Sequence, residues 1–233
     1  MTSLDSQITI RDLSFNIEGK SLLYDTNLSL YGEGITVLLG ANGAGKTIFL
    51  KLLAGLLTPC SGSITSNKRN LSIKTSAFVS QEPVILRRTV LKNMLFVLER
   101  ITPEKITFAK ELLKLMGLNK KEYQNALTLS AGEKQRLCLA RAIITNPEIL
   151  LLDEPTANIE PNSTTLIEKY LIQKVRSSRK IFFVTHDINQ ARRLADEIVF
   201  IHTGRVIEHS SAENFFKNPK TKEARKYISG KIN

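Results

Sequence analysis

Hydrophobic and polar positions along the chain follow two periods. Short apolar runs bounded by turn residues predict strands, and longer stretches with apolar residues three and four apart predict helices. The predicted strands are Ile8–Ile10, Leu28–Leu30, Ile35–Leu39, Ile64–Thr65, Ala77–Ser80, Ile149–Leu152, Ile181–Val184 and Ile198–Ile201. The predicted helices are Lys46–Leu57, Thr89–Leu115 with a break at Thr102-Pro103, Ser130–Thr145, Ser163–Arg176 and Ile188–Ala195. Because strands and helices alternate, the pattern predicts a mostly parallel sheet covered on both faces.

One long helical stretch interrupts this alternation. We therefore expect a single domain over 1–233, with a helical subdomain at approximately 86–140 inserted into an α/β core. Within the stretch, Thr102 precedes Pro103, and proline is favoured at the first position of a helix, so a new helix is expected to begin there.

Composition excludes several classes of protein. With 42% hydrophobic residues in 233, the chain can bury a substantial core. Its longest unbroken apolar run is Met94–Leu98, whereas a membrane span needs about 20 residues. Cys60 and Cys138 are too few for a disulfide framework, which fits a reducing cytosol. We expect a globular protein with neither a membrane span nor a secretion signal.

The charge balance is basic, with 33 Lys+Arg against 22 Asp+Glu and a net charge of +11. Nucleotides, nucleic acids and anionic lipids are the candidate anionic partners. The stretch 217–231 is rich in cations, and we interpret it as a solvated helical face, with contact to phospholipid or a membrane partner as the alternative. Tryptophan is absent and aromatic residues make up 6%, so stacking on bases is disfavoured and no nucleic-acid partner is expected.

The segment Gly40–Thr47 matches the phosphate-binding pattern G-x-x-x-x-G-K-[ST] and lies between a predicted strand and a predicted helix. Glycines let backbone N–H groups approach an anion, and the helix start adds unpaired donors. Lys46 supplies a charge to the β and γ phosphates, and the Thr47 hydroxyl can ligate Mg²⁺. The residues expected to bind the nucleotide are Gly40, Asn42, Gly43, Ala44, Gly45, Lys46, Thr47 and Ile48. This pattern alone indicates only a nucleoside triphosphate.

Two acids, Asp153 and Glu154, follow the apolar run Ile149–Leu152. At the carboxyl end of a strand they would lie at the mouth of an open α/β sheet, where ligands bind. Adjacent strand residues face opposite ways, so distinct roles are expected. Asp153 would hold Mg²⁺, directly or through water, and Glu154 would orient and deprotonate the attacking water. The alternative, that the acids merely end the strand before Pro155, is disfavoured beside a phosphate-binding loop.

A further segment, residues 129–136, precedes the helix that leads to Asp153. Ser130 and Glu133 in it form a capping box, which on its own would be a structural feature. The segment resembles the LSGGQ signature motif of ATP-binding cassette (ABC) ATPases, and we name it the signature segment. The chain resembles that family from end to end, through motifs in the family's order: the phosphate-binding loop, Gln81 within Val79–Pro83, the signature segment, the acid pair, the loop Pro155–Glu160, and His186 within Val184–Asp187.

This resemblance implies a P-loop ABC cassette with a RecA-like core, an N-terminal antiparallel β subdomain and an inserted helical subdomain. It implies ATP and Mg²⁺ as cofactors, with Gln81 sensing Mg²⁺ and the attacking water and bordering a membrane partner. His186 would hydrogen-bond the γ-phosphate and lie near Glu154. Cassettes of the family pair head to tail, so Ser130 and the Gly132 N–H would face the γ-phosphate held by a second copy of the chain.

The resemblance also implies partners and a location. We expect a homodimer of cassettes on separate transmembrane permease subunits, a substrate-binding protein outside the cell membrane, and a peripheral position on the membrane's cytoplasmic face. The C-terminal segments resemble importer ATPases for oxyanions, so the predicted function is ATP hydrolysis that energises import of tungstate, molybdate or phosphate. The alternatives are a polar amino-acid importer, a soluble ABC ATPase that acts on ribosomes or nucleic acid, and a non-hydrolysing binding subunit.

Three departures from the family pattern concern the nucleotide. The signature segment carries Glu133 in place of glutamine, and its carboxylate would repel phosphate if it turned inward. Ile48 stands where a second hydroxyl residue is usual, which removes a hydrogen bond to the α-phosphate. The aromatic that stacks on adenine in the family falls near Ile17, with Phe15 as the substitute. Loss of stacking predicts loose base selectivity.

Overall fold

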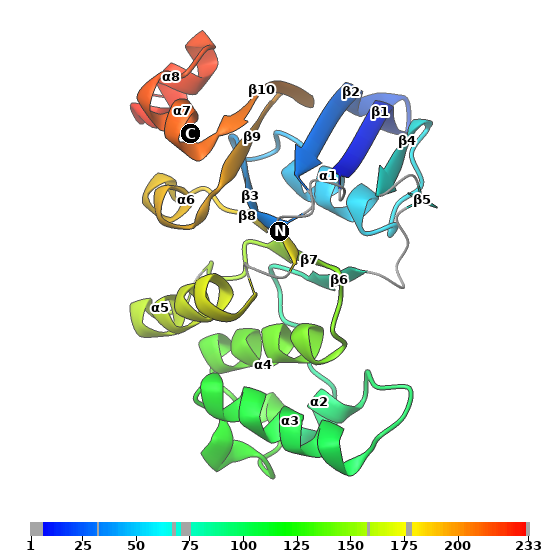
Figure 1. The fold of residues 1–233 in the computed structure, drawn as a ribbon, viewed down its shortest axis with the longest axis vertical. Helices are drawn as coiled ribbons and strands as arrows, with labels where there is room; N and C mark the ends of the chain where they lie inside the picture. The colour runs from blue at the N-terminus through cyan, green and yellow to red at the C-terminus, as the bar shows by residue number, and fades with distance from the viewer. Residues whose placement is uncertain are drawn as a thin grey trace, which may run out of the picture.

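The structure is a computed structural model that describes residues 7–31, 33–66, 69–70, 76–157, 159–175 and 179–231, and its strands form two sheets (Figure 1). The antiparallel sheet has the order β2-β1-β4-β5, with β1 at Gln7–Ile17, β2 at Lys20–Tyr31, β4 at Ser61–Ser66 and β5 at Arg69–Asn70. The larger sheet has the order β10-β9-β3-β8-β7-β6, with β3 at Gly34–Leu39, β6 at Ser76–Val79, β7 at Ile149–Asp153, β8 at Lys180–Val184, β9 at Glu197–His202 and β10 at Arg205–Ser211.

The larger sheet is parallel from β9 to β6, and β10 pairs antiparallel with β9. This confirms the predicted mostly parallel sheet. The helices are α1 at Lys46–Leu53, α2 at Val90–Leu95, α3 at Pro103–Leu115, α4 at Ala131–Ile144, α5 at Pro161–Tyr170, α6 at Ile188–Leu194, α7 at Ala212–Lys217 and α8 at Lys222–Ile228. Short 3₁₀ turns cover Asn119–Lys121 and Ala126–Thr128.

Side chains of β3 alternate between two hydrophobic cores. Ile35 and Val37 belong to the larger core, which the helices on one face complete, and Leu38 belongs to the core on the opposite face. There α1 lies between the two sheets (Figure 1), and its Phe49 and Leu50 belong to the same core as residues of both sheets. Both faces of the sheet are therefore covered, which explains why its central strands are continuous apolar runs.

Helices α2, α3 and α4 lie together at the end of the molecule opposite the antiparallel sheet (Figure 1). Thr89 and Thr102 cap α2 and α3 by accepting hydrogen bonds from Lys92 N and Lys105 N. Pro103 is the first residue of α3, as its sequence position predicts. Within the described ranges, no helix combines the length and apolar character needed to cross a membrane.

The predicted end of the first helix at Leu57 is wrong, because α1 ends at Leu53. Gly55 takes a left-handed φ of 68° and Leu56 N donates back to Lys51 O at 2.9 Å, which closes the helix with a glycine turn. The helix predicted over Ser163–Arg176 begins earlier, with Pro161 as its first residue, and continues past Tyr170 as a π-type turn over Leu171–Val175. Arg176 lies outside the described residues.

The first two strands are also longer than predicted. β1 and β2 form a hairpin that turns at Glu18 and Gly19, which have φ values of 49° and 76°. The turn pairs Ile17 with Lys20 and so extends both strands.

A buried ionic cluster joins four strands of the larger sheet, among them β3 and β8, which lead into the site. Glu197 on β9 accepts from Lys180 Nζ on β8 at 2.5 Å, from Thr36 Oγ1 on β3 at 2.6 Å and contacts His209 Nε2 on β10 at 2.8 Å. Burial alone would raise the pKa of Glu197, but the contacts with His209 and Lys180 outweigh it and the pKa is lowered. The cluster therefore fixes the relative positions of four adjacent strands.

Replacement of Lys180 by methionine removes one partner from this cluster and leaves the Glu197 charge buried. We expect the free energy of unfolding to fall by about 3–5 kcal/mol, measured by urea denaturation. Lys217→Met is the control, because that lysine pairs with Glu213 on the exposed surface. Equal stability changes in the two variants would contradict a stabilising role for the cluster.

Candidate functional site

The phosphate-binding loop connects β3 to α1. Gly40 has no room for a side chain, because a Cβ there would lie 2.1 Å from the Ile201 carbonyl oxygen. Gly45 takes a left-handed φ of 106° at the N-cap of α1. Among the described residues no side chain caps this helix start, so its first N–H groups remain available to an anion.

Lys46 lies over this loop. Its Nζ donates to the carbonyl oxygens of Gly40 at 2.7 Å and Ala41 at 2.9 Å. Burial lowers the pKa of Lys46, although the carboxylates of Glu154 and Asp153 act in the opposite direction. An ammonium has three hydrogens, so two of them can anchor the lysine to the loop while the third reaches a phosphate.

Thr47 and Asp153 form a corner of oxygen atoms. Thr47 Oγ1 donates to Asp153 Oδ1 at 3.2 Å, and Asp153 is 4% exposed at the end of β7. Burial raises the pKa of Asp153, the Thr47 hydrogen bond opposes the rise, and the nearby charge of Glu154 adds to it. A cation at this corner would offset the cost of the buried charge, and oxygen ligands suit Mg²⁺. These residues therefore fit the metal that the sequence predicts.

Glu154 follows Asp153 directly at the end of β7. Its backbone has a left-handed φ of 45°, and Ala157 N donates to its carbonyl oxygen at 3.0 Å, which closes a turn directly after β7. Such a conformation is strained for a residue with a side chain, and strained residues gather at functional sites. Glu154 Oε2 lies 3.4 Å from Gln81 Nε2 and 3.3 Å from His186 Nδ1. The structure thus brings together all three residues predicted to act at the reacting phosphate.

All of these side chains except that of Asp153 face one cavity of about 740 Å³, a volume typical of small-molecule sites. It is lined by Lys20, Leu22, Asn42, Gly43, Gly45, Lys46, Thr47, Ile48, Gln81, Glu154, Ala157 and His186. Gly40, Ala44 and Asp153 are buried and do not line it. The cavity holds most of the residues that the sequence assigned to the nucleotide, and its volume and chemistry suit a triphosphate.

Comparison with known proteins gives the family. Residues 23–157 match the model of the ABC transporter family, which covers more than half of the chain. The chain belongs to the ABC transporter family. The match extends over the phosphate-binding loop, the signature segment and the acid pair, and it assigns to this chain an ATP-binding ATPase domain of that family.

Individual relatives agree with this membership. The phosphate import ATP-binding protein PstB of Malacoplasma penetrans is 35% identical over 98% of this chain and 88% of its own length. The tungstate uptake system ATP-binding protein TupC of Peptoclostridium acidaminophilum is 36% identical over 90% of this chain and its whole length. The structure of cbiO1 from Clostridium perfringens, part of the ABC transporter complex cbiONQ, has a TM-score of 0.81 at 26% identity, over 97% of this chain and 95% of that chain.

The signature segment lies outside the cavity of its own chain. Ser130 is the N-cap of α4, and the capping box is present: Ser130 Oγ accepts from Glu133 N at 3.3 Å and Ser130 N donates to Glu133 Oε2 at 3.0 Å. Glu133 Oε1 meets Lys121 Nζ at 2.6 Å. Burial alone would raise the pKa of Glu133, but these contacts lower it. The Glu133 carboxylate is therefore turned back onto the start of its own helix and paired with Lys121.

Gly132 lies where a side chain would be crowded. A Cβ there would lie 3.0 Å from Ser163 Oγ on α5, and the buried Arg136 on α4 donates to that same hydroxyl. Asn158, in the loop that precedes α5, lies outside the described residues. The start of α4 thus packs against α5, and Ser130, the N-cap of α4, is exposed.

Lys20 and Leu22 are cavity residues that the sequence did not indicate. They come from β2, and the signal that could have found them is the Glu18-Gly19 turn, which folds β2 back beside the loop. Ile17 is 47% exposed and does not line the cavity. The suggestion that Phe15 replaces the stacking aromatic is wrong, because its ring is buried in the core beneath the hairpin.

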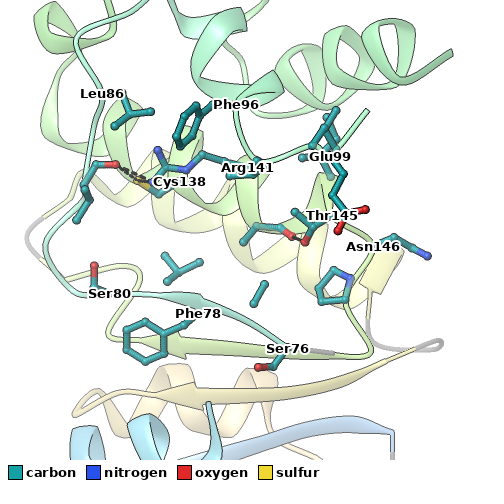
Figure 2. Close-up of a pocket in the computed structure, with 18 of the residues that line it drawn as sticks. Ser76, Phe78, Ser80, Leu86, Phe96, Glu99, Cys138, Arg141, Thr145 and Asn146 are labelled. Carbon is teal, nitrogen blue, oxygen red and sulfur yellow. Dashed lines mark hydrogen bonds between the residues drawn. The ribbon is translucent and has the colours of Figure 1, made fainter. Parts of the chain in front are cut away.

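A second cavity, of about 970 Å³, lies between β6 and α4 (Figure 2). Phe78 and Ser80 border it on the sheet side, and Cys138 and Arg141 of α4 lie across from them. Arg141 donates to Val84 O at 2.7 Å, which fixes the segment after Gln81 against α4. The rim includes three exposed apolar side chains, Val84, Phe96 and Val97.

In the described parts of the chain, no aromatic residue lines the nucleotide cavity, so we expect the base to lack a stacking contact worth about 1–3 kcal/mol. We expect the protein to hydrolyse GTP and ATP with kcat/KM values within about tenfold of one another. Parallel steady-state assays with the two Mg²⁺-nucleotides measure this, and a strict preference for ATP would contradict it.

Proposed function

We propose that this chain is the ATP-hydrolysing subunit of an importer for an oxyanion. The observation that carries the proposal is the convergence of Glu154, Gln81 and His186 on a cavity that also contains Lys46 and Thr47. A phosphate-binding loop alone would indicate binding, whereas a carboxylate held between an amide and an imidazole beside it supports hydrolysis.

Each side chain has a role that its position supports. Lys46 and the N–H groups at the start of α1 bind the phosphates, while Glu154 orients the attacking water and takes its proton, a contribution of about 10²–10⁴ in rate. Gln81 and His186 hold the Glu154 carboxylate in place. Thr47 and Asp153, with Gln81 nearby, would hold Mg²⁺, which neutralises charge on the phosphate oxygens.

The signature segment supports a second contribution from another copy of the chain. Ser130 and the N–H groups at the start of α4 are suited to an anion, yet they do not line the cavity of their own chain. We infer that two copies pair head to tail, so that each signature segment faces the nucleotide held by the other. Because Lys121 pairs with Glu133, the carboxylate is not aimed at that nucleotide.

The cavity between β6 and α4 suits a permease subunit. Val84 on its apolar rim lies in the segment after Gln81, so an occupant there would contact the segment that carries a residue of the catalytic group. The relative cbiO1 is described as part of an ABC transporter complex. We propose that an apolar segment of a separate membrane subunit docks here, which places the chain peripherally on the cytoplasmic face of the membrane, opposite a substrate-binding protein.

The substrate class rests on the relatives, whose names specify phosphate and tungstate. Both are tetrahedral oxyanions, and they would be recognised by the binding protein and the permease. The reading frames beside the gene test this: a binding protein encoded there should bind phosphate, tungstate or molybdate in a titration. Selective binding of a polar amino acid would replace the oxyanion proposal and leave the ATPase proposal intact.

Glu154→Gln removes the general base but keeps the size and hydrogen-bonding capacity of the side chain. We expect ATP binding to persist, turnover to fall by at least about 100-fold, and an ATP-bound dimer to accumulate, measured by phosphate release and light scattering. Lys46→Ala is the comparison variant, because loss of the lysine should weaken ATP binding itself. Full turnover in Glu154→Gln would remove Glu154 from the mechanism, and a strictly monomeric ATP-bound variant would contradict the paired arrangement.

Phe96→Asp places a charge on the rim of the second cavity, where an apolar partner would have to desolvate it. Copurification with the permease encoded beside the gene should be lost. Phe108→Asp is the control, since Phe108 is exposed on α3 and does not line this cavity. Permease binding that survives Phe96→Asp, or is lost equally in both variants, would argue against docking at this cavity.

A further inference from the structure

A buried polar network connects the loop after Glu154 to the two helices behind it. Gln190 on α6 is 3% exposed. Its Nε2 donates to Thr156 Oγ1 at 2.9 Å and to Glu168 Oε1 on α5 at 2.9 Å, so both amide hydrogens are used. The Thr156 hydroxyl also lies 3.2 Å from Gln190 Oε1. The amide therefore joins three separate segments of the chain.

Glu168 anchors this network. It is buried, and Arg193, one turn beyond Gln190 on α6, donates to both of its oxygens at 2.8 and 3.0 Å. A buried carboxylate paired with an arginine through two hydrogen bonds is a geometrically specific contact. Because Glu168 holds α6 at Gln190 and at Arg193, rotation of α6 about its axis is restricted.

The start of α6 is held by a separate contact. Asp187 caps the helix and accepts from Asn189 N at 2.8 Å and Gln190 N at 3.2 Å. His186 immediately precedes this cap, so the position of its ring depends on where the helix begins. A helix fixed by Glu168 therefore fixes the backbone from which His186 projects.

Thr156 lies two residues after Glu154, within the turn that the left-handed Glu154 begins. That conformation needs support from its surroundings. The Gln190 amide provides this support through its hydrogen bond to Thr156. Glu154 and His186 lie 3.3 Å apart. The hydrogen bond between Thr156 and Gln190 is thus a second contact between the same two segments of the chain.

We propose that Gln190 is a positioning residue for hydrolysis, which sets the distance between Glu154 and His186 by clamping Thr156 to α6. The inference rests on the proposed roles of Glu154 and His186. Gln190 is not among the residues that line the nucleotide cavity, so we expect it to affect turnover and not nucleotide affinity.

The experiment compares Gln190→Leu, Thr156→Val and the double variant in the full-length chain. Gln190→Leu removes the amide at similar size, and Thr156→Val removes only the hydroxyl, so the second is the milder change if the first impairs folding. Gln124→Leu is the matched control, because Gln124 Nε2 also donates to a threonine hydroxyl, that of Thr128 at 2.7 Å, in the helical segment away from the cavity. The measurements are kcat, KM, ATP affinity and the thermal midpoint.

We expect each single variant to lower kcat about tenfold, as small displacements of reacting groups do, while ATP affinity stays within about twofold of the parent. The double variant should be no slower than the slower single variant, since Gln190→Leu already removes the contact that Thr156→Val breaks. In a His186→Ala background, Gln190→Leu should lower the residual rate no further. Gln124→Leu should keep the parent kcat.

Three results would overturn the inference. One is an unchanged kcat in both single variants. Another is a loss of ATP affinity and thermal stability in step with kcat, which indicates a purely structural role. The third is a further decrease in the His186→Ala background. Failure of the proposed function is recognised separately, because Glu154→Gln would then retain turnover, and the Gln190 inference would fall with it.

Discussion

Parallel pairing of β6, β7 and β8 is the constraint on which the site depends. In register, Val79 lies beside Leu152, and Asp153 lies beside Val184. Gln81, Glu154 and His186 follow these paired strand ends and therefore lie at one edge of the sheet. β3 ends at the same edge and continues into the phosphate-binding loop. A shift in the register of any one strand would separate the groups, and the buried contacts of Glu197 with Thr36 and Lys180 oppose such a shift between β3 and β8.

The sequence predicted the parts of the fold in which local pattern and burial agree. The strands of the larger sheet are covered on both faces, so they appear as apolar runs, and the phosphate-binding loop has a fixed spacing. Glu154 was assigned from the acid pair at the end of a predicted strand, Gln81 and His186 were assigned through the family resemblance, and only the structure shows their mutual distances. Gly40 admits no side chain because the Ile201 carbonyl lies against it. This is likewise a tertiary contact, which no local sequence pattern reveals.

Errors arose where tertiary pairing decides the outcome. β1 has register shifts near Leu13 and Phe15, and each shift changes which face a side chain occupies. The burial of Phe15 could not be predicted from alternation for that reason. The orientation of Glu133 was open for a related reason, since its partner Lys121 lies on a separate turn and is brought close only by the packing of the helical segment.

The separation of Ser130 from the cavity of its own chain has a consequence for the rate law. If a nucleotide is enclosed only when two copies meet, turnover by the isolated protein depends on the square of its concentration while copies are scarce. Attachment of both copies to one membrane complex makes the encounter intramolecular, with an effective concentration of about millimolar for short connections. Tethering would then convert a dilution-sensitive enzyme into one whose turnover is set by the complex that holds it.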